Sequence, residues 1–297
     1  MAQVPAPQPQ RHLSIAPRPG DAVRVALVAA FESLVEHSGE LRRGSTDPEE
    51  IHDARVAARQ FRSRAVALSS VLDVDAITTQ LDDLRGFART LGDVRDLDVL
   101  LEDLSAEADG VPDELRPSAA LILAGFADER SAALEAVRRR IEGESYERLL
   151  HSLASIAMSP PLRRPEHDPD PAVVMTSAWK AVARRARAAR AAPTDETLHA
   201  LRIRTKRARY AAEALEPFVG KRAARFARAA GQLQDVLGRH QDAVVAIDKL
   251  SNVAERDPGL AFAAGWISRA RERVRVDTRD AWPKAWRSLA RKERRFW

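Results

Sequence analysis

Apolar residues recur along most of the chain at the three- and four-residue spacing that is typical of amphipathic helices. The first such segment runs from Asp21 to about Glu40, with Val23, Leu27 and Leu34 on one face. Further segments follow over about 47–72, 75–107, 112–141, 144–157, 171–192, 194–215, 221–254 and from 258 onward. No alternating strand pattern extends beyond a few residues, so the chain is predicted to be all-α.

Prolines and capping residues divide these helices into two groups. Thr46 or Asp47 can cap the second helix, where Pro48 suits the first turn, and Thr194 or Asp195 can cap a helix of the second group. Five prolines interrupt the helical pattern between residues 160 and 171. We expect four regions, namely a disordered tail (1–20), an N-terminal helical half (21–158), a proline-rich linker (159–171) and a C-terminal helical half (172–297).

One segment of the chain is repeated with its chemistry intact. Both copies read His-x-x-Arg-x-x-x-(Arg/Lys)-x-x-Arg, and at roughly 100° per residue these positions share a sector of about 80° on a helix. The two stripes are His52, Arg55, Arg59 and Arg62, and His199, Arg202, Lys206 and Arg209. The neighbouring sector is apolar and predicted to face the core, with Ala54, Ala58, Phe61, Ala65 and Leu68 in one copy and Leu201, Thr205, Ala208, Ala212 and Leu215 in the other.

A second repeated motif follows each stripe at nearly the same separation. Leu-Gly-x-x-x-Asp occurs at residues 91–96 and again at 237–242. We expect its glycines to permit close helix approach, and Asp96 and Asp242 to anchor cations of the stripes. The remaining basic residues near the motifs are expected to extend the binding surface; they are Arg89, Arg239 and His240. Because Arg239 and His240 flank the second copy, that half is expected to bind more strongly.

Composition narrows the function. The 297 residues include no cysteine, which excludes disulfides, thiolate nucleophiles and cysteine metal sites and fits the cytoplasm. No apolar run approaches the roughly 20 residues of a membrane span, and the N-terminal stretch lacks the apolar region of a signal peptide. The net charge of +5 is modest, but residues 180–209 carry many cations against only Asp195 and Glu196. Such clustering indicates a polyanionic partner.

The two repeated motifs resemble those of the CHAD family, the conserved histidine α-helical domain, over nearly the whole chain after the tail. The resemblance implies two pseudo-symmetric four-helix-bundle-like halves forming one domain, with a basic groove between them. It also implies binding of inorganic polyphosphate and an association with polyphosphate or storage granules. Within that groove, His52 and His199 either contact the ligand or hydrogen-bond Asp96 or Asp242.

Two alternatives stand beside polyphosphate binding. The same basic surface could bind nucleic acid, although Tyr210 is the only obvious stacking residue near the stripes. A metal-dependent phosphohydrolase is suggested by the dipeptides His52-Asp53 and His167-Asp168, of which the second falls in the linker. No recognisable helix-turn-helix or RNA-binding signature supports the first alternative, and His52-Asp53 has no matched partner in the second half to support the second. We therefore expect a binding protein without catalytic activity, metal or organic cofactor.

Overall fold

The computed structural model describes residues 19–163, 170–291 and 294–297. Most of this part of the chain is helical, and its only strand-type pairing is one isolated antiparallel bridge between Leu72 and Leu162, which confirms the all-α prediction. The long helices in chain order are α1 (Pro19–Arg42), α2 (Pro48–Ala67), α3 (Thr78–Ala108), α4 (Arg116–Glu142), α5 (Glu144–Met158), α6 (Pro171–Ala191), α7 (Asp195–Val219), α8 (Lys221–Arg256) and α9 (Ala261–Leu289). Short 3₁₀ turns precede three of them, at Asp75–Ile77, Asp113–Leu115 and Pro258–Leu260.

The two stripe-bearing helices, α2 and α7, begin at side-chain caps. Asp47 accepts a hydrogen bond from the Glu49 amide at 2.9 Å before α2, and Thr194 forms a reciprocal capping box with Thr197 before α7. At the other end, α7 runs past the expected Leu215 to Val219 and is followed by Gly220, which takes a positive φ of 62°. The caps therefore confirm where the two helices start, while α7 is longer than its pattern predicted.

The helix predicted to reach Leu72 ends five residues earlier, at Ala67. The residues that follow pair with the start of the linker instead. Asp73 donates its amide to Pro161 O, and Arg163 donates its amide to Val71 O, both at 2.7 Å. The described beginning of the linker is thus fastened to the N-terminal helices. Residues 1–18 of the expected tail and 164–169 of the linker lie outside the described residues.

Three buried clusters hold the helices together. One is formed mainly by α1–α5, with Ala214 of α7, and contains Leu27, Phe61 and Phe87. A second is formed mainly by α6–α9 and contains Phe226 and Trp282. A third cluster joins the two groups, because α3 and α4 contribute Leu97, Leu104, Ile122 and Phe126 to it and α8 and α9 contribute Leu250 and Ile267. The two helical groups therefore share a core, which the expectation of two halves with a groove between them did not include.

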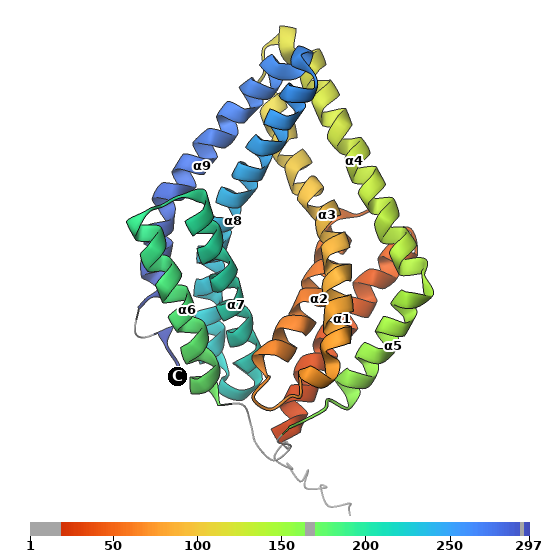
Figure 1. Ribbon diagram of the computed structural model, residues 1–297, viewed down its shortest axis with the longest axis vertical. Coiled ribbons are helices and arrows are strands. Elements are labelled where there is room, and N and C mark those ends of the chain that lie inside the picture. The colour runs from red at the N-terminus through yellow and green to blue at the C-terminus, as the bar shows by residue number, and fades with distance from the viewer. Residues whose placement is uncertain (1–18, 164–169, 292–293) are drawn as a thin grey trace, which may run out of the picture.

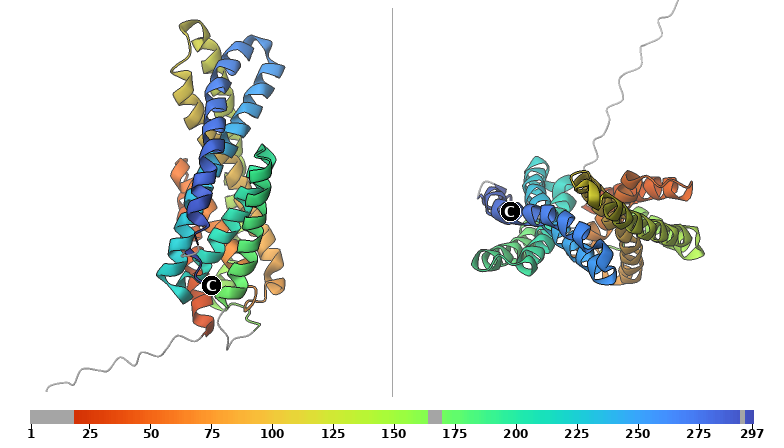
Figure 2. Two further views of the ribbon diagram at one scale, coloured as in Figure 1. Left: turned by 90° about the vertical axis from the view of Figure 1, so that its left-hand side faces the viewer. Right: turned by 90° about the horizontal axis from the view of Figure 1, so that it is seen from above.

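The helices enclose a central space. In Figure 1, α1–α5 lie on one side and α6–α9 on the other, and the hairpins α3–α4 and α8–α9 converge at the apex. Figure 2 shows that these hairpins extend beyond α6 and α7 toward that apex. At the opposite end α2 packs beside α7. The two stripes are thereby brought to the middle of the molecule, below the shared apical core.

Candidate functional site

The predicted core-facing sectors of α2 and α7 are buried. No exposed surface remains on Ala54 and Phe61 of α2, on Leu68 just after it, or on Leu201 and Ala208 of α7. The other predicted members of both sectors are at most 1% exposed. Each stripe therefore runs along the edge of a packed helix face. This placement orients the cations and limits the entropy that they lose when they bind a ligand.

Arg59 is the point at which the two stripe helices meet. Its Nη2 donates a hydrogen bond to the hydroxyl of Tyr210 on α7 at 2.6 Å, and its guanidinium lies 5.6 Å from the centre of that ring. Burial lowers the pKa of Arg59, and the charges of Arg55, Arg202 and Arg209 lower it further. Arginines of both stripes are thus close enough to repel one another.

A cleft of about 210 Å³ opens between α2 and α7, and we refer to it as the α2–α7 cleft. Its described lining carries six cationic side chains and no Asp or Glu; the cations are Arg59, Arg62, Arg85, Arg202, Lys206 and Arg207. Burial lowers the pKa of Arg62, and Arg85 and Arg207 act in the same direction. Like charges held together in this way favour an anion between them.

A second cleft, of about 240 Å³, opens between α3 and α8 and is called the α3–α8 cleft. Arg55, His199 and Arg202 line it, together with three carboxylates and an amide from Asp96, Asp103, Asp242 and Gln241. Arg202 lines both clefts, so they adjoin. Cations concentrate in the α2–α7 cleft, whereas the charges in the α3–α8 cleft are mixed.

The two repeated motifs meet at this second cleft. Arg55 Nη1 donates to Asp96 Oδ1 at 2.8 Å, which confirms the expected anchoring of a stripe cation. The glycines make room for arginine rather than for a helix backbone, because a Cβ on Gly92 would lie 3.2 Å from Arg55 Cζ. On the other side, a Cβ on Gly238 would lie 3.8 Å from Arg202 Nε. The repeat thus places an arginine against a glycine in each half.

Asp242 differs from its counterpart. Burial raises the pKa of Asp242 to about 6, against the opposing charge of Arg202, and Asp103 and Asp96 contribute to the increase. No hydrogen bond joins Asp242 to a cation among the described residues. Asp96 therefore anchors a stripe cation through a hydrogen bond, whereas Asp242 does not.

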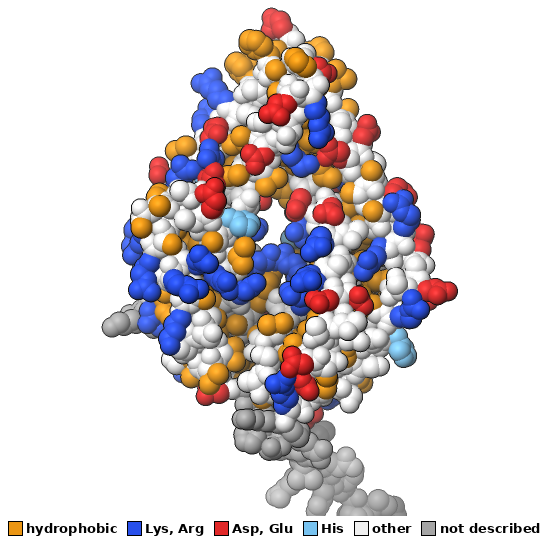
Figure 3. Space-filling view, viewed as in Figure 1, with side chains coloured by type: hydrophobic (Ala, Val, Ile, Leu, Met, Phe, Trp, Pro, Cys, Tyr) orange, Lys and Arg blue, Asp and Glu red, His pale blue; other side chains and the backbone are white. Residues whose placement is uncertain are grey.

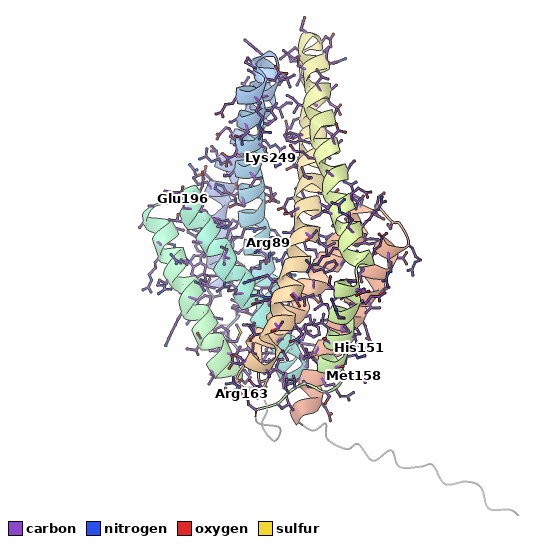
Figure 4. All side chains as sticks on the ribbon, turned by 45° about the vertical axis from the view of Figure 1, so that its right-hand side comes forward. Arg89, His151, Met158, Arg163, Glu196 and Lys249 are labelled. Atoms are coloured by element: carbon purple, nitrogen blue, oxygen red, sulfur yellow. The ribbon has the colours of Figure 1, made fainter. Side chains whose placement is uncertain are left out.

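Figure 3 shows one face of the molecule with Lys and Arg side chains gathered across its middle, on both sides of a central hollow. Acidic side chains gather above this basic band, toward the apex. Of the other cations expected at the site, Arg89 is exposed on α3, one turn after Arg85, and Figure 4 shows it on the side of α3 that faces α8. The basic band therefore includes residues from helices on both sides of the central hollow.

A family model described as the CHAD domain matches residues 25–251. The chain belongs to the CHAD domain family. The proteins MT2285 and Rv2226 from two strains of Mycobacterium tuberculosis are each 28% identical over 250 residues, which is 78% of this chain and 45% of the relative. The chain thus spans about half the length of these curated relatives.

Two solved structures share the fold. PptA from Streptomyces chartreusis superposes with a TM-score of 0.73 at 21% identity, covering 91% of this chain and 100% of that one. The CHAD domain from the plant Ricinus communis superposes with a TM-score of 0.71 at 24% identity, covering 93% of both chains. At these identities the two likenesses show a shared fold.

The paired histidines of this CHAD domain do not form hydrogen bonds with the aspartates of the second motif. His199 Nδ1 lies 2.5 Å from Gln241 Oε1, one residue before Asp242. His52 is half-buried, and burial lowers its pKa with a further contribution from Arg95. The alternative in which each histidine pairs with Asp96 or Asp242 is therefore wrong. His52 is held toward its neutral form, since both leading causes disfavour the charged ring.

Three residues of the second half depart from the predicted basic surface. His240 is only 2% exposed and lies among α7, α8 and α9 instead of in either cleft. Arg209 donates to Glu213 at 2.7 Å and lines a separate hollow with Glu213, Glu216 and Asp235. Arg239 is exposed on α8 and lines neither cleft. Stronger binding in the second half was expected because of Arg239 and His240, and neither residue lines a cleft.

Two cleft residues were not singled out by the sequence. Arg85 of α3 lies seven residues before Gly92, whereas the matching position in α8 is Gly231. The signal was the i, i+4 spacing of Arg85 and Arg89, which places both on the helix face that carries the second motif. Arg207 lies immediately after Lys206 and was assigned only to the general basic region. Its participation depends on how α2 and α7 pack, which the pattern within one helix does not specify.

No group of three or more His, Cys, Asp and Glu side chains suited to a metal ion occurs among the described residues. The dipeptide His167-Asp168, which prompted the metal hypothesis, lies outside the described residues. Among the described helices, none is both long and apolar enough to cross a membrane.

Proposed function

We propose that this CHAD domain binds inorganic polyphosphate, with the polymer lying along the α2–α7 cleft and reaching the arginines of the α3–α8 cleft. The family membership supports the ligand class. The observation that carries the proposal is the lining of the α2–α7 cleft, where six cations gather without a described carboxylate. A flexible chain with negative charge at every unit matches such a lining better than a single small anion does.

The chemistry of the lining residues fits a phosphate chain. Arginine presents a planar fork that donates two hydrogen bonds to one phosphate and keeps its charge at neutral pH. Four stripe positions on one helix rise roughly 15 Å at 1.5 Å per residue, a length that spans several phosphate units. Because Arg202 lines both clefts, a bound chain contacting it lies within reach of both stripes. Contacts in two connected clefts raise the effective local concentration of the polymer.

Charge reversal inside the cleft tests this assignment. The double variant R59E/K206E replaces one cation of each stripe and is expected to lose polyphosphate binding by at least about 100-fold, since charged hydrogen bonds contribute roughly 1.5–3 kcal/mol each. Affinity is measured by calorimetry on the full chain, and helical circular dichroism checks the fold. The matched control is R148E/K284E, which makes the same change in net charge at exposed positions on α5 and α9. Retained affinity in R59E/K206E would place the site elsewhere.

Nucleic acid is the alternative polyanion. Tyr210 is only 9% exposed, and its hydroxyl accepts a hydrogen bond from Arg59, so its ring is not free to stack on a base. We therefore expect polyphosphate to displace double-stranded DNA when both are present at equal phosphate concentration. Preferential retention of the DNA would favour the alternative.

The proposed role is binding without hydrolysis, and granule association would follow from binding to a polymer-coated surface. Arginine and lysine side chains in the α2–α7 cleft position phosphate but supply neither a metal ligand nor a general base at neutral pH. Incubation with polyphosphate and Mg²⁺ is expected to release no phosphate above a buffer control. Release that depends on the divalent metal would identify an enzyme.

A further inference from the structure

His240 is a buried histidine with polar partners on both sides of its ring. The side chain belongs to α8 and is 2% exposed. Its Nδ1 lies 3.1 Å from the Arg275 carbonyl oxygen and 3.2 Å from Thr278 Oγ1, both on α9. Its Nε2 lies 3.0 Å from Asp195 Oδ1, at the first residue of α7. The ring therefore connects three helices through two nitrogen atoms.

The hydrogen-bond partners of the His240 ring require both ring nitrogens to act as donors. The Arg275 carbonyl can only accept, and the single proton of the Thr278 hydroxyl is directed to the Val274 carbonyl at 2.7 Å. Nδ1 must therefore carry a proton. Nε2 faces a carboxylate oxygen, which also accepts hydrogen bonds, so Nε2 must carry one as well. Only the positively charged imidazolium satisfies every contact in this arrangement.

The carboxylate of Asp195 favours the positively charged ring, whereas the two arginines that share this carboxylate oppose that charge. Asp195 also accepts hydrogen bonds from Arg275 Nη2 at 2.6 Å and from Arg279 Nη2 at 3.1 Å. Although burial opposes the effect, hydrogen bonds from Arg275, His240 and Arg279 hold the pKa of Asp195 below its usual value. Glu272 of α9 pairs with Arg275 at 3.0 Å and offsets part of the positive charge near the ring. On α8 itself, the nearest charge along the chain is the exposed Arg239.

The corresponding part of the first half is built without a histidine. Val94 occupies the position that matches His240 and is fully buried. The start of α2 is tied by a different pair, because Arg130 of α4 donates to the Thr46 carbonyl at 3.0 Å and also pairs with the buried Asp98 of α3. Arginine keeps its charge near neutral pH, so this tie does not titrate there. The two stripe helices are therefore anchored by chemically different contacts.

We propose that His240 is a positioning residue whose imidazolium fixes the start of α7 against α8 and α9, so that deprotonation loosens the second stripe and leaves the first in place. His199 and Arg202 follow Asp195 within two helical turns and depend on this anchor for their position. The effect on polyphosphate rests on the proposed function, whereas the anchoring itself does not.

Nuclear magnetic resonance on the full chain without polyphosphate tests the anchor directly. Imidazole nitrogen shifts report the protonation of His240 between about pH 5.5 and 8, and hydrogen exchange reports protection of amides 199–202 against the matched amides 52–55. We expect both ring nitrogens to be protonated at pH 5.5. Their titration should then reduce protection of 199–202 by about tenfold relative to 52–55, the order expected for one charge-assisted hydrogen bond. A neutral ring at pH 5.5 would overturn the proposal. Protection of amides 199–202 that stays unchanged when the ring loses its proton would also overturn it.

The variant H240Q separates anchoring from ligand binding. Its amide can donate to only one side of the site and does not titrate, so the relative protection of 199–202 should be low and independent of pH. In an Asp242→Asn background, which removes the carboxyl whose pKa is raised in the α3–α8 cleft, the affinity for polyphosphate should fall more steeply with rising pH when His240 is present than in H240Q. If polyphosphate does not bind at all, the proposed function is wrong. The hydrogen-exchange data then still test whether His240 fixes the start of α7. Equal pH dependence with and without His240 would contradict its positioning role.

Discussion

At the residue scale, the candidate site contains arginines whose pKa values are lowered by burial and by neighbouring positive charges. Arg59 donates to a neutral hydroxyl and faces arginines of both stripes, and its pKa is lowered by burial and by those charges. An anion in the α2–α7 cleft would relieve that repulsion. Asp242 acts in the opposite sense in the adjoining cleft, because each unprotonated carboxylate there reduces the attraction for phosphate. We therefore expect the affinity for polyphosphate to depend on the charge of Asp242.

Polyphosphate binding is expected to strengthen as pH falls from about 7.5 to 5. The pKa of Asp242 is raised to about 6, so the carboxyl is ionised above that pH and neutral below it. Protonation removes a negative charge from the α3–α8 cleft. The variant D242N should bind more tightly than wild type at pH 7.5 and show a smaller change with pH, measured by calorimetry at constant ionic strength. A wild-type affinity that weakens on acidification would contradict this assignment.

Sequence reasoning identified the stripe residues but not all of their partners. The 3.6-residue period was sufficient to place Arg55, Arg59 and Arg62 beside a buried face. It could not distinguish His240, which lies next to a motif residue and faces a different direction. Neighbouring residues on a helix are separated by about 100°, so proximity in sequence does not imply a shared surface. The hydrogen bond from Arg59 to the Tyr210 hydroxyl could not be predicted either, because it joins segments 151 residues apart.

At the scale of elements, each copy of the Leu-Gly-x-x-x-Asp motif places its glycine against an arginine, but the distance between glycine and arginine differs between the copies. The guanidinium of Arg55 lies against Gly92 and is held by Asp96, whereas Arg202 lies farther from Gly238. A glycine within a helix costs roughly 0.5–1 kcal/mol relative to alanine. Space for the arginine side chain explains why that cost is tolerated at Gly92.

Alanine substitutions at the two glycines should therefore have different effects. G238A places its Cβ at ordinary contact distance and is expected to raise the free energy of unfolding by about 0.5–1 kcal/mol. G92A places its Cβ 3.2 Å from Arg55 Cζ, so the guanidinium must move while Asp96 holds it. We expect a smaller gain in stability and several-fold weaker polyphosphate binding, measured by urea unfolding and calorimetry. Equal behaviour of the two variants would show that the glycines do not accommodate the arginines.

Element boundaries were predictable where local capping determines them and uncertain where tertiary contacts do. The starts of α2 and α7 followed from Asp47 and Thr194, whose side chains cap their own helices. The end of α2 did not follow, because Val71 and Asp73 pair with the distant residues 161–163. A periodic pattern continues into such residues without revealing that their backbone groups have other partners.

At the scale of the whole molecule, the apical core explains how two stripes can face a common space. The hairpins α3–α4 and α8–α9 share a buried cluster, and Arg271 of α9 pairs with Asp103 of α3 at 2.7 Å across the two groups. Contacts at the apex and between α2 and α7 join the two groups of helices, which lie on opposite sides of the middle of the molecule (Figure 1). The repeat predicted two groups of helices, but apolar residues at the ends of long helices did not reveal which group they would contact.

Binding is expected to weaken steeply with salt, because the proposed site neutralises several phosphates at once. If all six cations of the α2–α7 cleft contact phosphate, the slope of log affinity against log salt approaches about −4, using the roughly 0.7 counterions released per contact in single strands. The variant R59E/K206E should flatten the slope, whereas R148E/K284E should leave it nearly unchanged. A slope near zero for the wild type would exclude an electrostatic cleft.

The most direct measurement is a crystal structure of the full chain with polyphosphate of defined length. The proposed function predicts phosphate density along the α2–α7 cleft, with oxygens within hydrogen-bond distance of Arg62, Arg202 and Lys206. It also predicts that the chain continues toward Arg55 in the α3–α8 cleft. Phosphate density confined to the exposed arginines of α6, with both clefts empty, would contradict the assignment of the site.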